Sequence, residues 1–205
     1  MESPFCDILY GHSEIVMNVA RSTDGQLMIS GAKDRSALLW KMNDETKSFA
    51  CVGKCLGHTE TVSAVAVSQK QATFAITGSH DLTVKLWDLV YNQDGSISPK
   101  TRFTIKAHDK DIQSLTVAPN NRIFASGALD KTAKIWSTVD GALLGSLKGH
   151  RRGVWCVRFS PSDQVVATSS TDKTVKLWSL VDYSCIKVRL YYKREYSYPR
   201  LLKDI

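Results

Sequence analysis

Short apolar runs separated by polar turns recur along the chain, and three such runs fall in each of four successive stretches. Runs rich in Val, Ile, Leu and Ala and bounded by Gly, Asp, Asn or Ser are typical of β-strands. Apolar residues dominate these runs, as expected where both faces of a sheet pack on neighbouring sheets. The pattern therefore predicts an all-β fold. The expected strands are residues 15–21, 27–32 and 37–42; 62–67, 74–78 and 84–89; 112–118, 123–127 and 133–137; and 154–160, 165–169 and 175–180, with further strands at 5–10 and 50–56.

A second pattern has a much longer period and opens each stretch with a Gly-His or Ala-His pair. An Asp follows the His by 22 residues (23 in the second stretch), a Trp follows the Asp by six, and a Ser or Thr precedes the Asp by four. Successive His residues are 46, 50 and 42 apart, close to the ~40–45-residue period of propeller blades. The chain is therefore a repeat protein of four units. Its recurring residues are His12, Ser30, Asp34 and Trp40; His58, Thr77, Asp81 and Trp87; His108, Ser126, Asp130 and Trp136; and His150, Thr168, Asp172 and Trp178.

These residues resemble the signature of the WD-repeat (beta-transducin-like) family over about residues 5–186, although only Trp87-Asp88 keeps the literal Trp-Asp pair. The resemblance implies β-propeller blades, each a four-stranded antiparallel sheet, in four repeats at about 11–48, 57–90, 107–140 and 149–182. Residues 5–10 would be an outer strand. The resemblance also implies that each His, Ser/Thr, Asp and Trp set forms a hydrogen-bonded structural tetrad. Propellers of this family usually have seven blades, so four units predict an incomplete ring, and we expect a truncated or alternatively spliced product.

Two segments depart from the repeat pattern. Residues 91–100 (YNQDGSISPK) have the Asn, Asp, Gly, Ser and Pro content of an exposed loop. Residues 187–205 are basic and diverge from the repeats, where the family pattern would continue into another Gly-His pair. We expect this tail to lie outside any repeat.

Composition and charge narrow the class of protein. The chain is 43% hydrophobic and 23% charged, as in ordinary globular domains. No run approaches the ~18 apolar residues of a membrane span, and we expect an intracellular protein without membrane contact. Five cysteines, an odd number without paired spacing, predict buried reduced thiols. The net charge of +7 resides largely in the tail, so a solvated surface and a polyanion contact both remain open for the repeats.

Hydrolase catalysis and zinc binding are two alternatives to a purely structural role for the repeated residues. Ser/Thr, His and Asp are the members of a hydrolase triad, but a catalytic set occurs once per site, whereas this set occurs four times. Cys51, Cys55 and His58 do not have a standard zinc spacing, and a second ligand pair is absent. Phosphate-binding loop motifs are also absent. The sequence therefore predicts no enzyme activity, no metal and no cofactor.

Basic residues follow the His in two units and are candidates for partner binding. Arg151 and Arg152 come directly after His150, and Lys110 has an equivalent place in the third unit. The resemblance places these loops on the top rim of a propeller, a common docking face. Arg pairs suit phosphate or carboxylate partners because the guanidinium offers a fixed fork of donors. Two solvated Arg side chains without a partner remain the alternative.

The third and fourth units are further similar to nucleolar members of the family that belong to the small-subunit processome. This similarity implies a non-enzymatic protein-interaction scaffold of the nucleus and nucleolus, acting in pre-rRNA processing and ribosome biogenesis. The implied partners are other processome proteins, with direct or indirect contact to pre-rRNA or small nucleolar RNA, and no small-molecule substrate. A WD-repeat adaptor in signalling or ubiquitin-ligase assembly would have the same fold and is the alternative.

Overall fold

The computed structural model describes residues 8–69 and 71–190. Within these residues the secondary structure consists of β-strands, with no helix. The strands form four separate four-stranded antiparallel sheets, each built from four consecutive strands. The first sheet contains β1 (Val16–Arg21), β2 (Leu27–Ala32), β3 (Ala37–Met42) and β4 (Phe49–Cys55), and the second β5 (Val62–Val67), β6 (Phe74–Ser79), β7 (Thr83–Tyr91) and β8 (Ile97–Lys106). The third contains β9 (Ile112–Val117), β10 (Ile123–Ala128), β11 (Thr132–Ser137) and β12 (Leu143–Lys148), and the fourth β13 (Val154–Phe159), β14 (Val165–Ser170), β15 (Thr174–Ser179) and β16 (Cys185–Leu190).

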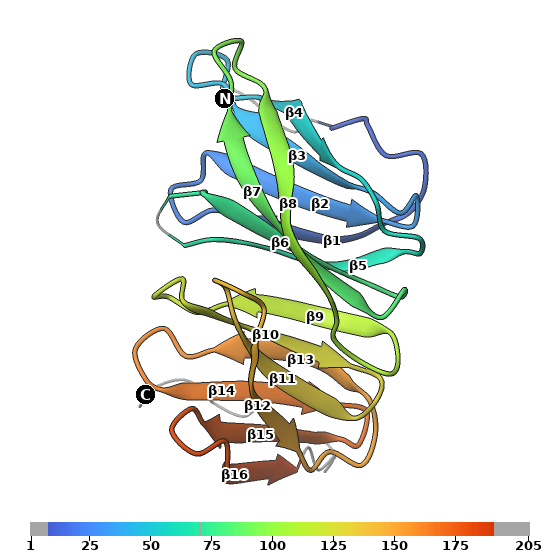
Figure 1. Ribbon diagram of the computed structural model, residues 1–205, viewed down its shortest axis with the longest axis vertical. Coiled ribbons are helices and arrows are strands. Elements are labelled where there is room, and N and C mark those ends of the chain that lie inside the picture. Colours follow the sequence, from blue (N-terminus) through green and yellow to red (C-terminus); the bar gives the residue numbers. More distant parts are fainter. Residues whose placement is uncertain (1–7, 70, 191–205) are drawn as a thin grey trace, which may run out of the picture.

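The four sheets follow one another through the molecule in chain order, from the first at one end of Figure 1 to the fourth at the other. Their first strands β1, β5, β9 and β13 contact one another in succession. This is the arrangement of propeller blades, and the four blades do not close into a ring. The predicted all-β architecture with an incomplete ring is therefore confirmed.

A glycine in the second strand lets each blade approach the next. A Cβ built on this glycine would meet a branched side chain of the next blade's first strand at 2.8–2.9 Å, closer than real Cβ contacts come. The branched side chain is itself buried, so each junction is a tight fit of side chain against backbone. The pairs are Gly31 with Val62, Gly78 with Ile112 and Gly127 with Val154.

Within residues 8–69 and 71–190, the first and fourth blades each have one face without a neighbouring blade. Val16 and Val19 have the repeat positions of Val62 and Val65, but they are 48% and 55% exposed. At the other end, Ser169 stands where the first three blades carry the packing glycine. The apolar cores accordingly lie between successive blades, in three clusters.

Two segments at the ends of the described chain differ from expectation. Residues 8–10 form no strand, and residues 5–7 lie outside the described residues. The first sheet is already complete with β1 to β4, so Ile8 and Tyr10 have no strand to pair with.

At the other end, β16 runs to Leu190 by pairing with β15, so the expected repeat boundary after residue 186 was too early. Main-chain pairing needs no apolar side chains, and Lys187 and Arg189 remain exposed. Residues 191–205 of the basic tail lie outside the described residues.

Half of the expected loop at residues 91–100 is strand. Tyr91 ends β7 and pairs with Ile97 of β8, so only residues 92–96 turn. Ile97 is 3% exposed and packs in the core between the first two blades, while its carbonyl lies against Gly53 of β4. The composition suggested a loop, but this one buried residue anchors a long hairpin. β7 has nine residues, compared with six in the other third strands.

The four cysteines in the described part of the chain are free, but only some are buried. Cys55 is buried and Cys156 is half-buried, whereas Cys51 and Cys185 are exposed. The expectation of buried thiols was wrong for the latter two. Cys51 and the buried Cys55 share the outer strand β4, so the position along that strand decides which of the two thiols is covered. Cys6 lies outside the described residues. Nowhere in the described part of the chain is there a helix long and apolar enough to cross a bilayer.

Candidate functional site at the repeat rim

One chain of four polar side chains recurs in every blade. In the fourth blade, Trp178 Nε1 donates to Thr168 Oγ1 at 2.7 Å, and the same oxygen lies 2.7 Å from His150 Nε2. His150 Nδ1 then lies 2.9 Å from Asp172 Oδ2. The corresponding distances in the other three blades are 2.7–2.9 Å. The structure thus brings together all sixteen residues that the spacing had grouped into tetrads.

The direction of these hydrogen bonds follows from their chemistry. A carboxylate can only accept hydrogen bonds, so His150 Nδ1 carries a proton and donates to Asp172. In a neutral imidazole Nε2 is then an acceptor, and the hydroxyl of Thr168 donates to it while the oxygen of that hydroxyl accepts from Trp178. Each of the hydrogen-bonding groups that link the four side chains therefore has a partner. A buried polar group without a partner costs roughly 1–3 kcal/mol, so such a chain stabilises a blade only when it is complete.

The tetrad carboxylate also closes the turn between the second and third strands. Asp172 Oδ1 accepts from the backbone N–H and the hydroxyl of Thr174, at 2.9 and 2.6 Å, which is an Asx-type turn. Lys173, between them, has a φ of 68°. The residue after the Asp has a left-handed φ in every blade: Arg35, Leu82, Lys131 and Lys173.

These contacts keep the tetrad carboxylates ionised. Burial raises the pKa of Asp34, but hydrogen bonds from Ser36, His12 and the backbone outweigh it and lower the pKa to about 2. The same balance between burial and hydrogen bonds lowers the pKa of the other three carboxylates. A negative charge therefore lies under each rim loop at neutral pH.

The tetrad positions the loop that carries the predicted rim residues. Asp172 Oδ2 accepts from the backbone N–H of Arg151 at 2.9 Å, and the carbonyl of Arg152 accepts from Ser170 Oγ at 3.0 Å. Both backbones are thus fixed, while both side chains are exposed. Lys110 is exposed on the equivalent loop of the third blade, where Asp130 accepts the preceding N–H at 3.2 Å. Arg151, Arg152 and Lys110 accordingly lie on the rim of adjacent blades.

Four further rim residues were missed from the sequence. Arg35, Lys131 and Lys173 are exposed on the turns that directly follow a tetrad Asp. Trp155 is 51% exposed on β13, one residue beyond the buried Val154. The signals were present: a basic residue follows three of the four tetrad Asp residues, and Trp155 is the one Trp of five outside a tetrad.

The rim of the third and fourth blades is basic. Apart from the tetrad carboxylates, its turns carry Asp109 and the partly exposed Asp111 as acidic groups, and Asp111 lies 3.8 Å from His80. The basic side chains of the same turns are all exposed: Lys110, Lys131, Arg151, Arg152 and Lys173. Arg side chains bind carboxylates and phosphates in bidentate fashion. This rim, defined by those five residues and Trp155, suits an acidic protein surface or a nucleic-acid backbone.

The other candidate chemistry does not have the geometry it requires. A nucleophile must be reachable by substrate. Thr168 is 1% exposed and its hydroxyl oxygen accepts from Trp178, so a substrate cannot reach it. His58 is bonded to Asp81 and Thr77. Burial raises the pKa of the Cys55 thiol to about 12, which disfavours the thiolate that a metal needs. Within residues 8–69 and 71–190, no three His, Cys, Asp or Glu side chains form a group able to hold a metal ion.

The blades and tetrads define the class of protein. The sequence profile of the WD domain, G-beta repeat family matches residues 4–41, 49–88, 99–137 and 141–179. Each match contains one tetrad Asp and one tetrad Trp. The chain therefore belongs to the WD-repeat family.

Individual relatives narrow the comparison. The chain is 44% identical over 154 residues to transducin beta-like protein 3 of Bos taurus, covering 71% of the chain and 19% of that protein. It is 38% identical over 148 residues to U3 small nucleolar RNA-associated protein 13 of Saccharomyces cerevisiae, covering 69% and 18%. A ribosome biogenesis protein WDR12 homolog of Drosophila mojavensis is 30% identical over 117 residues, covering 53% and 27%. The chain thus matches about a fifth of the length of the first two relatives.

Proposed function

We propose that the chain is a non-enzymatic interaction scaffold in ribosome biogenesis, acting in nucleolar pre-rRNA processing within an assembly similar to the small-subunit processome. The observation that carries this proposal is its similarity to transducin beta-like protein 3 and to a protein named for its association with U3 small nucleolar RNA. A WDR12 homolog named for ribosome biogenesis supports the same process. The nucleolus is accordingly the proposed location.

The basic rim is the proposed partner surface. Arg151 and Arg152 have backbones fixed by the tetrad and by Ser170, so their side chains start from a defined position. Because the loop backbone is already ordered, binding at this rim need not pay for ordering the loop. The partners that fit are acidic surfaces of other processome proteins, with pre-rRNA or small nucleolar RNA as a second contact. Trp155, 51% exposed on β13 after the same loop, offers an aromatic surface.

The test is affinity purification of the tagged chain from cells, with identification of the proteins that copurify. We expect ribosome-biogenesis proteins with the unaltered chain and their loss with the double variant Arg151→Glu/Arg152→Glu. The control is Lys100→Glu/Arg122→Glu, which makes the same charge change at two exposed residues away from the rim. Recovery of signalling proteins or ubiquitin-ligase subunits in place of ribosome-biogenesis proteins would support the adaptor alternative and contradict the proposal.

A further inference from the structure

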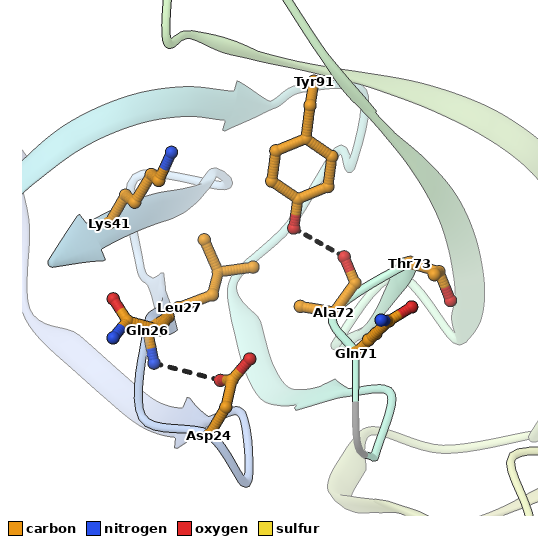
Figure 2. Close-up of a pocket in the computed structure, with 8 residues that line it drawn as sticks. All are labelled: Asp24, Gln26, Leu27, Lys41, Gln71, Ala72, Thr73 and Tyr91. Carbon is orange, nitrogen blue, oxygen red and sulfur yellow. Dashed lines mark hydrogen bonds between the residues drawn. The ribbon is translucent and has the colours of Figure 1, made fainter.

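A hollow of about 400 Å³ lies between the first and second blades, at the strand ends opposite the rim. The turn between β1 and β2 contributes Asp24, the start of β2 contributes Leu27, and Lys41 comes from the end of β3. The turn before β6 and the end of β7 contribute Ala72 and Tyr91 (Figure 2). The volume is within the range of ligand pockets, roughly 300–1,000 Å³. Its position separates it from the proposed partner surface at the rim.

The long second hairpin supplies one wall of this pocket. Because β7 extends to Tyr91, the ring of this residue lies beside the turn before β6, and its hydroxyl donates to the carbonyl of Ala72 at 2.6 Å. The hydrogen bond fixes the ring while the side chain stays 50% exposed. Leu27 and Ala72, which are 2% and 8% exposed, form an apolar floor. The pocket therefore combines a fixed aromatic face with a small apolar surface.

Lys41 brings a positive charge to the pocket. It follows the tetrad residue Trp40, at the place where the second blade has Asp88, and Asp88 is ion-paired with Arg102. The first blade therefore has the opposite charge at this position. Among the described residues no carboxylate forms an ion pair with Lys41, and its side chain lines the hollow (Figure 2).

Asp24 contributes a fixed acceptor at another edge of the same pocket. Its carboxylate accepts from the hydroxyl of Ser22 and, at 3.0 Å, from the N–H of Gln26, and these bonds lower its pKa. Figure 2 shows Leu27 between Asp24 and Lys41. The phosphates of a nucleic acid offer this carboxylate no hydrogen-bond donor, and every one of them is charged. A peptide can satisfy both groups, since it carries backbone N–H donors as well as acidic side chains.

We propose that this pocket docks an acidic peptide segment of a partner protein. A Glu or Asp side chain of the segment pairs with Lys41, a neighbouring apolar side chain packs on the ring of Tyr91 and on Leu27, and Asp24 accepts from a backbone N–H of the segment. Charge complementarity at Lys41 selects the acidic residue, and the apolar floor selects its neighbour. This interaction is independent of the rim and adds a second docking face on the opposite side of the blades.

The test is selection of a displayed library of random short peptides on the immobilised full chain, followed by fluorescence anisotropy with the selected peptides. We expect selected sequences that contain Glu or Asp next to an apolar residue. We also expect Lys41→Glu to weaken their binding at least about tenfold, the effect of losing a charge-assisted hydrogen bond. Tyr91→Ala should weaken it too, and amide resonances of Gln71, Ala72 and Thr73 should shift on binding.

The matched control is Lys148→Glu, which makes the same charge change at an exposed lysine of the third blade. It should leave peptide binding unchanged, and thermal melting should show that all variants remain folded. The proposal would be overturned if the selected peptides bound the Lys41→Glu variant with the same affinity as the unaltered chain. A library that yields no pocket-dependent binder would also overturn it, as would a single-stranded RNA oligonucleotide that binds at Lys41 where peptides do not.

Discussion

Val16 and Val62 have the same position in successive repeats, yet Val62 is 1% exposed against Gly31 and Val16 is 48% exposed. The difference is that Val62 has a preceding blade to pack on. We expect Val62→Ala to lower the free energy of unfolding by about 2 kcal/mol, because it leaves a cavity in a packed junction. Val16→Ala should change it by less than about 0.5 kcal/mol. Chemical denaturation measures both, and equal losses would show that the first blade is covered in solution.

The packing glycine leads to a second prediction. Gly127→Ser places a Cβ 2.9 Å from Val154, and such overpacking costs typically 1–3 kcal/mol. We expect Gly127→Ser to lower the melting temperature clearly. The reverse change in the fourth blade, Ser169→Gly, relieves no contact with a further blade and should have little effect. If the Gly127→Ser protein melted at the same temperature as the unaltered chain, the blades could move apart at this junction without loss of stability.

The tetrads can be tested by removing one hydroxyl without changing side-chain shape. Thr168→Val leaves the buried Trp178 N–H without its acceptor and His150 without its hydroxyl partner. We expect a loss of about 1–3 kcal/mol in the free energy of unfolding. The control is Thr171→Val on the exposed neighbouring turn. Denaturation curves that coincide for the two variants would show that the tetrad contributes nothing to stability.

Acid should destabilise the blades through the tetrad carboxylates. The folded pKa of Asp34 is about 2 and lies below its ordinary value of 3.8, and the pKa of the other three is lowered as well. The unfolded chain therefore binds protons more readily than the folded one. The stabilisation is fully present above about pH 5 and is lost as the pH falls through about 4 towards 2. Melting temperatures across this range measure it; a flat profile would contradict the lowered pKa values.

The repeat period made much of the fold predictable. The recurrence of His, Asp and Trp at near-fixed spacing indicated the blades, because each blade needs the same chain of buried polar groups to close the same turn. The strand positions followed from apolar runs between turn residues. The set His150, Thr168, Asp172 and Trp178 could be named together from spacing alone, and the structure joins its members by hydrogen bonds.

Other features depend on contacts that a local pattern does not contain. The extension of β7 to Tyr91 depends on Ile97, which is buried against the first blade. The composition of residues 91–100 is that of a loop and does not reveal this burial. Cys51 is exposed and Cys55 is buried on the same strand β4, so the residue type alone does not predict which thiol is covered. The pocket at Lys41 combines residues of two repeats with the long hairpin, so neither repeat alone predicts it.

The most direct measurement of the central claim is crosslinking of the tagged chain in cells, followed by sequencing of the bound RNA and sedimentation of the chain in a gradient. The proposed scaffold role leads us to expect pre-rRNA or small nucleolar RNA in the crosslinked material, and sedimentation with pre-ribosomal particles. The rim variant Arg151→Glu/Arg152→Glu should lose both. Sedimentation of the unaltered, folded chain away from these particles, with no enrichment of either RNA, would contradict a role in ribosome biogenesis.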